Sequence, residues 1–135
     1  MMKEVHQVKI IIKRNDKYLL LKKVTATFKE HIGCWEVPGG KLEQNEDARE
    51  GAFREVLEET RTRCTIIKEL EPLTHHKEDT TIHTRVFLGT LKSGAINISR
   101  EHSAFCWKTI QETANMDNII YKDNLLKYLR EAERF

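Results

Sequence analysis

The chain has 135 residues, the size of one ordinary domain, and can bury a core without metal or disulfide cross-links. Hydrophobic residues make up 39% of it and charged residues 33%, which is the balance of a soluble globular domain, expected here over residues 1–135. The formal net charge of +2, from 23 Lys and Arg against 21 Asp and Glu, is too small to indicate a nucleic-acid or membrane partner.

The first half of the chain predicts strands followed by a helix. In chain order we expect a strand, its antiparallel hairpin partner, a polar loop and a short strand broken by Pro-Gly-Gly, over residues 8–14, 18–24, 25–33 and 34–43. Residues 46–60 predict a helix, because Asn45 is a good N-cap and acids occupy the first turn.

The second half predicts further strands and a C-terminal helix. We expect strands over residues 64–70 and 81–91, with a polar loop at 74–80 between them. A short strand is expected over 103–110 and a terminal helix from about 117 onward. In residues 81–91, apolar and polar side chains alternate, as a sheet with two different faces requires. Strands and helices follow no regular βαβ rhythm, so the fold class is α/β of the α+β kind, a mixed sheet flanked by helices.

Three cysteines lie far apart in the sequence, at Cys34, Cys64 and Cys106. This pattern is typical of a reducing compartment and not of a disulfide framework or a zinc site. The N-terminal segment lacks the apolar core of a signal peptide, and no run approaches the roughly 18 apolar residues of a membrane span. We therefore expect a cytoplasmic protein.

Three carboxylates gather on one face of the predicted helix at 46–60. At about 100° per residue, Glu55, Glu58 and Glu59 share an arc of about 100°, where like charges repel. The opposite face is expected to pack against the sheet; it carries Ala52, Phe53, Val56, Leu57 and Thr60. Clustered carboxylates suit Mg²⁺ or Mn²⁺, and magnesium bound in this way takes substrate phosphates. A solvated acidic face is the alternative.

Two glycine positions support a phosphate and metal site. Gly51 lies within the acidic face, one turn upstream, where it would leave room beside the site. The pair Gly39-Gly40 ends a short strand before the helix, so it could offer a backbone carbonyl to a metal and let a phosphate approach. A simple turn is the alternative for this pair, and its distance from the acids is the stronger signal.

These residues spell a known motif. From Gly40 the chain has five residues, Glu46, seven residues, Arg54-Glu55, an apolar residue, one more residue and Glu58-Glu59. This resembles the Nudix box, and the preceding WEVPGGKLE is similar to the W-E-x-P-G-G-K-x-E that often comes before it. The resemblance covers residues 35–62. It implies the Nudix α/β/α sandwich and hydrolysis of a nucleoside diphosphate linked to another moiety, with Mg²⁺ or Mn²⁺.

The resemblance also implies roles for individual residues. The metal ligands would be Glu55, Glu58, Glu59 and the carbonyl of Gly39. Glu46 and Arg54 would form a bridge that fixes the loop against the helix, and Arg54 would orient Glu55, which also makes Arg54 and Glu55 catalytic candidates. Gly40 is the glycine that opens the motif.

Two catalytic candidates lie outside this ligand set. Lys41 would face the phosphates or a catalytic glutamate. Glu101, in SREHSAFCW, resembles the loop glutamate that acts as a further ligand or base in MutT-type members; an exposed loop acid is its alternative. Pyrophosphate hydrolysis needs charge neutralised on two phosphates and a base for the water's proton, which this set could supply.

The chain departs from the motif at its end. Arg61 stands where the family has glycine, and Thr62 stands where it has an apolar residue. The glycine would end the helix in a left-handed conformation, in which a non-glycine residue is strained by roughly 1 kcal/mol. Neither change touches a proposed ligand, so we expect an effect on the helix end and not on the chemistry.

The substrate is less well indicated. The chain lacks the additional motifs of the coenzyme A, NADH, diadenosine-polyphosphate and ADP-ribose subfamilies, and WEVPGGKLE is most similar to MutT-type nucleoside-triphosphate members. Asn115, in TANMDNII, resembles a residue that reads an oxidised guanine, although it could equally cap the last helix. His83 or Phe87 could flank a base.

Three hypotheses follow. The leading one is a Mg²⁺-dependent pyrophosphohydrolase of a nucleoside triphosphate, monomeric or homodimeric, whose partner is the small nucleotide. The second is hydrolysis of ADP-ribose or a nucleotide sugar. The third is a nucleotide-binding sensor without turnover, against which the full set of Arg54 and three glutamates argues.

Overall fold

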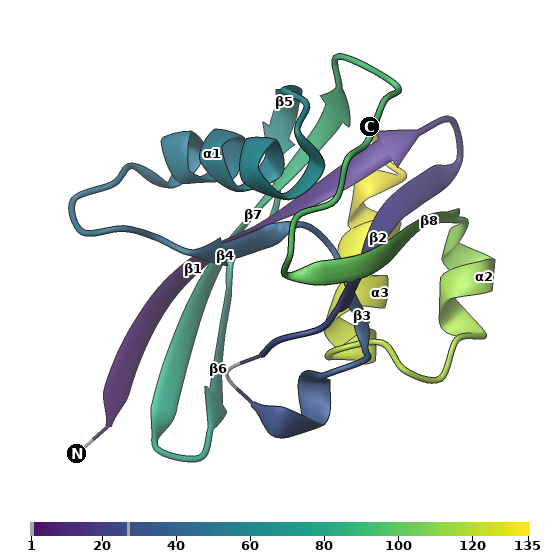
Figure 1. Cartoon of the computed structure of the whole chain (residues 1–135). Coiled ribbons are helices and arrows are strands. Elements are labelled where there is room, and N and C mark those ends of the chain that lie inside the picture. The colour runs from purple at the N-terminus through teal and green to yellow at the C-terminus, as the bar shows by residue number, and fades with distance from the viewer. Residues whose placement is uncertain (1, 27) are drawn as a thin grey trace.

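The computed structural model describes residues 2–26 and 28–135 (Figure 1). The strands are β1 (Lys3–Arg14), β2 (Lys17–Lys23), β3 (Trp35–Glu36), β4 (Gly39–Lys41), β5 (Cys64–Glu69), β6 (Leu73–Lys77), β7 (Thr80–Leu91) and β8 (His102–Lys108). The helices are α1 (Ala48–Thr60), α2 (Ile110–Ala114) and α3 (Lys122–Ala132), with a 3-10 turn, η1, at Lys29–His31. None of these helices is long and apolar enough to span a membrane.

The two longest strands, β1 and β7, run parallel at the centre of a mixed sheet. The strand order is β3-β2-β1-β7-β5, with β4 beside β1, β6 beside β7 and β8 beside β2. Helices α1 and α3 cover opposite faces of the sheet (Figure 1). The expected fold class, a mixed sheet flanked by helices, is confirmed.

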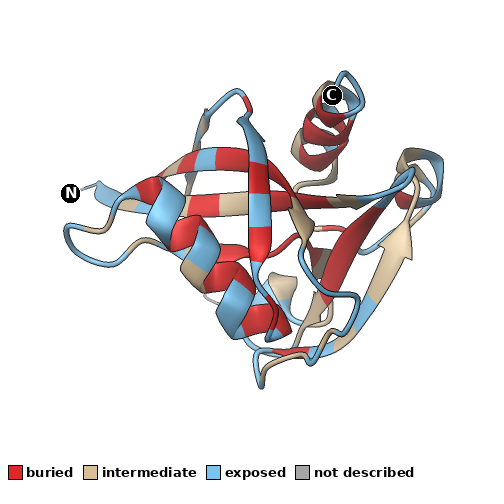
Figure 2. Cartoon of the chain, turned by 90° about the horizontal axis from the view of Figure 1, so that it is seen from above, coloured by how far each residue is buried: buried red, intermediate tan, exposed pale blue. Residues whose placement is uncertain are grey.

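Each face of the sheet has its own core (Figure 2). The core under α1 includes Val8, Ile10, Ile12, Leu19, Leu21, Ala52, Val56 and Phe87. The core under α3 includes Ile11, Leu20, Val86, Leu88, Leu125 and Leu129. Alternate residues of β1 and β7 therefore enter different cores, as the alternation in residues 81–91 predicts.

Several boundaries differ from the prediction. Helix α1 begins after Asp47, whose side chain accepts the N–H groups of Arg49 and Glu50; Asn45 is not the cap but a turn residue with φ of 63°. The expected polar loop at 74–80 is mostly strand β6, because its polar side chains alternate while its backbone pairs with β7. The pair Gly39-Gly40 does not end a strand; it forms β4 and pairs with β1.

The buried face of α1 also differs from the prediction. Phe53 and Leu57 are 38% and 39% exposed, whereas Glu55 and Glu59 are buried. The helix packs on the sheet through Ala52 and Val56. Both acids are buried with them, because Glu55 and Glu59 lie against the glycines of strand β4. The repulsion between the acids is therefore placed inside the protein and not on a solvated surface.

Candidate functional site

Arg54 links helix α1 to the loop that precedes it. Its Nε and Nη2 atoms lie 2.7 Å and 2.9 Å from the two oxygens of Glu46, and Nη2 also donates to the carbonyl of Lys41 at 3.2 Å. Nη1 donates to Glu55 at 2.9 Å and to Glu58 at 3.2 Å. These hydrogen bonds lower the pKa of Glu46 to about 2, so the pair is charged at neutral pH.

Glu55 lies directly against the backbone of β4. A Cβ built on Gly40 would be 2.7 Å from Oε1 of Glu55, so only glycine allows this contact. Gly51 has a similar use: a Cβ there would lie 2.4 Å from the side chain of Leu42 and 3.1 Å from Glu46. The room beside Gly51 is thus filled by the preceding loop and not left for a substrate.

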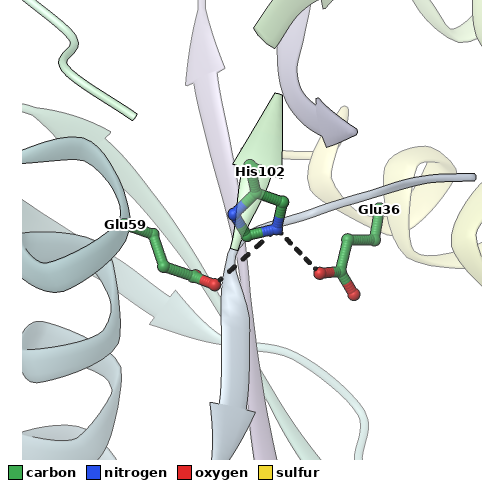
Figure 3. Close-up of side chains that lie close together, drawn as sticks. All are labelled: Glu36, Glu59 and His102. Carbon is green, nitrogen blue, oxygen red and sulfur yellow. Dashed lines mark hydrogen bonds and ion pairs between the residues drawn. The ribbon is translucent and has the colours of Figure 1, made fainter. Parts of the chain in front are cut away.

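Glu59 is the most buried acid of α1, at 2% exposure. Its Oε1 accepts the backbone N–H of Gly39 at 2.8 Å, and its Oε2 lies 3.9 Å from Nε2 of His102. The same imidazole nitrogen is 3.1 Å from Oε2 of Glu36, a buried residue of β3 (Figure 3). Potential ligand atoms of Glu36, Glu59 and His102 lie within 4.8 Å of one another, a spacing that one metal ion could bridge.

The buried carboxylates differ in their electrostatics. Burial, helped by the charges of Glu36 and Glu55 and opposed by the hydrogen bond from Gly39, raises the pKa of Glu59 to about 9. Burial also raises the pKa of Glu55, although Arg54 opposes this shift. Burial acts on Glu36 too, but the nearby Lys9 and Lys23 and the hydrogen bond from His102 hold its pKa well below the usual range.

A cavity of about 400 Å³ opens beside this cluster, between the sheet and α3. Its polar end is lined by Glu36, Lys9, Lys23 and Lys41. Its walls include four aromatic rings in edge-to-face sequence, with centroid distances of 5.5 Å, 5.2 Å and 4.7 Å: Phe28, His31, Tyr121 and His75. Glu36 belongs both to the cavity wall and to the carboxylate cluster, so the two are continuous.

Several polar atoms of the cavity wall are buried without a partner. Both ring nitrogens of His75 and the hydroxyls of Tyr121 and Tyr128 form no hydrogen bond with any residue that the structure describes. A buried polar group without a partner costs about 1–3 kcal/mol, and native proteins contain few of them. Three such residues around one cavity leave donors and acceptors free for the water or ligand that fills it.

A sequence model of the NUDIX domain family matches residues 4–129. The chain belongs to the Nudix family. It is 33% identical over 132 residues to a "MutT-like protein" of Streptomyces ambofaciens. The aligned region covers 95% of this chain and 80% of the relative. It is 29% identical over 116 residues to the "CTP pyrophosphohydrolase" of Escherichia coli K12, with 82% and 80% of the two chains covered. The crystal structure of a MutT protein from Methanosarcina mazei Go1 has the same fold, with a TM-score of 0.83 at 22% identity over 98% of this chain and 95% of that one.

Membership makes the protein a Nudix hydrolase, an enzyme that acts on phosphoric anhydride bonds. Nudix enzymes generally use divalent metals, and the donor set of this chain fits such an ion. Glu55 and Glu59 offer hard carboxylate oxygens, and burial, which raises the pKa of both groups, disfavours their charged forms, which a divalent cation would stabilise. The side chain of Glu58 is 57% exposed, and it shares a partner with Glu55, because Nη1 of Arg54 lies close to both carboxylates.

The other predicted residues lie at different distances from this cluster. The charge of Glu101 is among the causes that raise the pKa of Glu55, which places Glu101 within electrostatic reach of it. Lys41 lines the cavity, and Gly39 contacts Glu59 through its N–H.

The three predicted substrate residues are not among the residues that line the cavity. Asn115 is exposed at the C-terminal end of α2. Phe87 is a core residue under α1 and is 1% exposed. His83 stacks on His6 and contacts Glu4. Residues 83 and 87 share the α1 face of β7, whereas residues 82 and 84 face the cavity.

Glu36, His102 and the lysines beside them are the part of the site that sequence reasoning missed. Both residues stand next to positions that the sequence singles out: Glu36 lies within WEVPGGKLE, and His102 directly follows the candidate Glu101. Neither position has a local pattern that indicates burial. They meet because β2 pairs with both β3 and β8.

Proposed function

We propose that this Nudix hydrolase converts a nucleoside triphosphate to the nucleoside monophosphate and pyrophosphate. The observation that carries the proposal is that Glu36 joins the carboxylate cluster of α1 to an aromatic cavity. A nucleotide has the matching form, with anionic phosphates at one end and a planar, hydrogen-bonding base at the other. The relative named CTP pyrophosphohydrolase supports this substrate class.

In the proposed arrangement, the phosphates lie at the end of the cavity that Lys41 lines, near the acids of α1. Glu55, Glu58, Glu59 and the Gly39 carbonyl would hold Mg²⁺ or Mn²⁺. When bound, the ion neutralises phosphate charge and makes a water more nucleophilic. Arg54 keeps Glu55 in place through its 2.9 Å hydrogen bond from Nη1, while the edge of the guanidinium formed by Nε and Nη2 holds Glu46.

Water is the only co-reactant that the hydrolysis needs. The oxygen of water forms a bond to phosphorus, the anhydride P–O bond breaks, and its electron pair leaves with pyrophosphate. We assign the proton of that water to Glu101, an acid outside α1 whose charge is among the causes that raise the pKa of Glu55. The base fits the aromatic part of the cavity, where the free polar atoms of His75, Tyr121 and Tyr128 would read its edge.

The test is a substrate panel with Mg²⁺: canonical ribo- and deoxyribonucleoside triphosphates including CTP, then 8-oxo-dGTP, ADP-ribose, a nucleotide sugar and diadenosine polyphosphates. We expect monophosphate and pyrophosphate from one or more triphosphates. Preferred cleavage of ADP-ribose or a nucleotide sugar would overturn the substrate class, and nucleotide binding without any product would favour the sensor. In E58Q, we expect turnover to fall by about 100-fold or more with the fold intact.

A further inference from the structure

His102 separates two buried carboxylates (Figure 3). Its side chain is fully buried, and it reaches between Glu36 on β3 and Glu59 on α1. Because an ionised carboxylate only accepts hydrogen bonds, Nε2 carries the proton that it donates to Glu36 at 3.1 Å. The other ring nitrogen, Nδ1, is buried and has no partner among the described residues.

Glu36 has no oxygen free for a cation. Its Oε1 accepts Lys9 at 3.0 Å, and its Oε2 accepts both Lys23 at 3.0 Å and His102. A metal at Glu36 would lie beside two ammonium groups, each 3.0 Å from this carboxylate, whose positive charges would repel it. With the proton on Nε2, the nitrogen that faces both acids is not a ligand either. The spacing of the three groups fits a metal, but the hydrogen bonds of two of them do not.

Glu59 is different. Only its Oε1 is hydrogen-bonded by a described residue, through the N–H of Gly39. Its Oε2 is 3.9 Å from Nε2 of His102, which is too far for a hydrogen bond. This leaves Oε2 of Glu59 as the oxygen of the cluster that can bind a cation.

We propose that His102, oriented by Glu36, positions Glu59 for the divalent cation and is not itself a ligand. The inference rests on the proposed role of Glu59 as a metal ligand. The buried ring stands between Glu59 and the Lys9–Glu36–Lys23 group and so keeps Glu59 from rotating toward that group. Outer groups that orient metal ligands in this way commonly change metal affinity by about 10- to 100-fold when they are mutated.

Two conservative variants of the full chain separate this role from simple packing. Glutamine can place an N–H near the position of Nε2, whereas asparagine is too short to reach Glu36. Mn²⁺ binding is measured directly by electron paramagnetic resonance, and thermal unfolding is measured in parallel. We expect H102N to weaken Mn²⁺ binding about 10-fold or more and H102Q to stay within about 3-fold of the unmodified protein. The matched control is H76N, which removes a histidine hydrogen bond to Thr81 far from the cluster and leaves Mn²⁺ binding unchanged.

The same variants give a kinetic readout. In H102N the Mg²⁺ concentration for half-maximal activity is expected to rise, while kcat at saturating Mg²⁺ changes by less than about 3-fold, since the chemistry is retained once the ion is bound. A fall in kcat alone would contradict a positioning role. E36Q approaches the pair from the other side; it removes the charge that holds the imidazole, and we expect about 10-fold weaker Mn²⁺ binding.

The outcomes distinguish the inference from the proposed function. If the unmodified protein binds no Mn²⁺, or if E59Q binds it equally well, the metal assignment itself is wrong. If E59Q loses Mn²⁺ but H102N and E36Q retain it, the positioning role is overturned and the metal assignment stands. Equal losses in H102N and H102Q would make His102 a ligand, which also overturns the inference. Should H102N fail to fold, E36Q and H102Q decide by the same criteria.

Discussion

Replacing Gly40 by alanine would put a methyl group into the carboxylate of Glu55. The added Cβ would lie 2.7 Å, 2.8 Å and 2.9 Å from Oε1, Cδ and Oε2 of Glu55, where ordinary contact begins at 3.4 Å. The carboxylate must therefore move by about 0.5–0.7 Å. Gly40 does not have a left-handed backbone, so alanine adds this overlap without backbone strain.

The cost of this movement falls on function more than on stability. Moving Glu55 stretches its 2.9 Å hydrogen bond to Arg54, which is worth about 1–3 kcal/mol as a charged interaction. Reacting groups must be held to within about 0.5 Å, and a misplacement of 1 Å costs about 100-fold in rate. We expect kcat/KM of G40A to fall about 10- to 100-fold, Mn²⁺ binding to weaken, and the melting temperature to fall by about 5 °C.

The assay is steady-state release of pyrophosphate from the best triphosphate of the substrate panel, with Mn²⁺ titration and thermal unfolding of the same preparations. The matched control is G94A, where the added Cβ meets nothing closer than a guanidinium nitrogen of Arg14 at 3.8 Å. G94A should keep its activity and metal affinity. Full kcat/KM and unchanged Mn²⁺ affinity in G40A would show that the carboxylate of Glu55 is not part of the reacting geometry.

Four further changes test other parts of the structure. Arg61 ends α1 with φ of 61°, so R61G should keep or raise the free energy of unfolding, by up to about 1 kcal/mol, at unchanged Mn²⁺ affinity; a large loss of turnover would contradict this. R54K cannot hold both oxygens of Glu46 and also Glu55, and turnover should fall about 10-fold or more, whereas unchanged turnover would show that the bidentate contact is dispensable. Burial raises the pKa of Glu59 from 4.5 to about 9 in the metal-free protein, so the stabilising contribution of this group is complete below pH 4.5 and is lost as pH rises through 9. The melting temperature should therefore fall between pH 4.5 and 9, and it should fall less with Mg²⁺ present and less in E59Q. An identical pH profile for E59Q would refute the assignment. H75F should raise KM for the triphosphate about 10-fold with little change in kcat, and an unchanged KM would remove His75 from base binding.

Much of the fold could be predicted because its signals are local. The alternation along residues 81–91 correctly assigned the two faces of this strand to different surroundings, and the expected C-terminal helix contributes Leu125 and Leu129 to the core under α3. The same reasoning failed for β6, whose THHK reads as a loop by composition. Its strand character comes from pairing with β7, which composition does not record.

The helix at 46–60 shows a second limit. A helical wheel groups residues by direction but does not say which direction is inward. Phe53 and Leu57 were expected inside because they are apolar, yet the glycine strand β4 leaves space for Glu55 and Glu59 instead. Partly exposing the side chains of Phe53 and Leu57 costs less than leaving Glu55 and Glu59 buried without the hydrogen bonds that Arg54 and the Gly39 N–H donate to them.

The sequence by itself determined the family and the spacing of Arg54 and the acids, because each depends on residues within one or two helical turns or on a motif of fixed length. Only the tertiary structure decided that Glu55 and Glu59 are buried, that His102 meets Glu36 from 66 residues away, and that the cavity lies on the face of residues 82 and 84. Those facts depend on strand order and register, which bring distant segments together through pairings that no local pattern specifies.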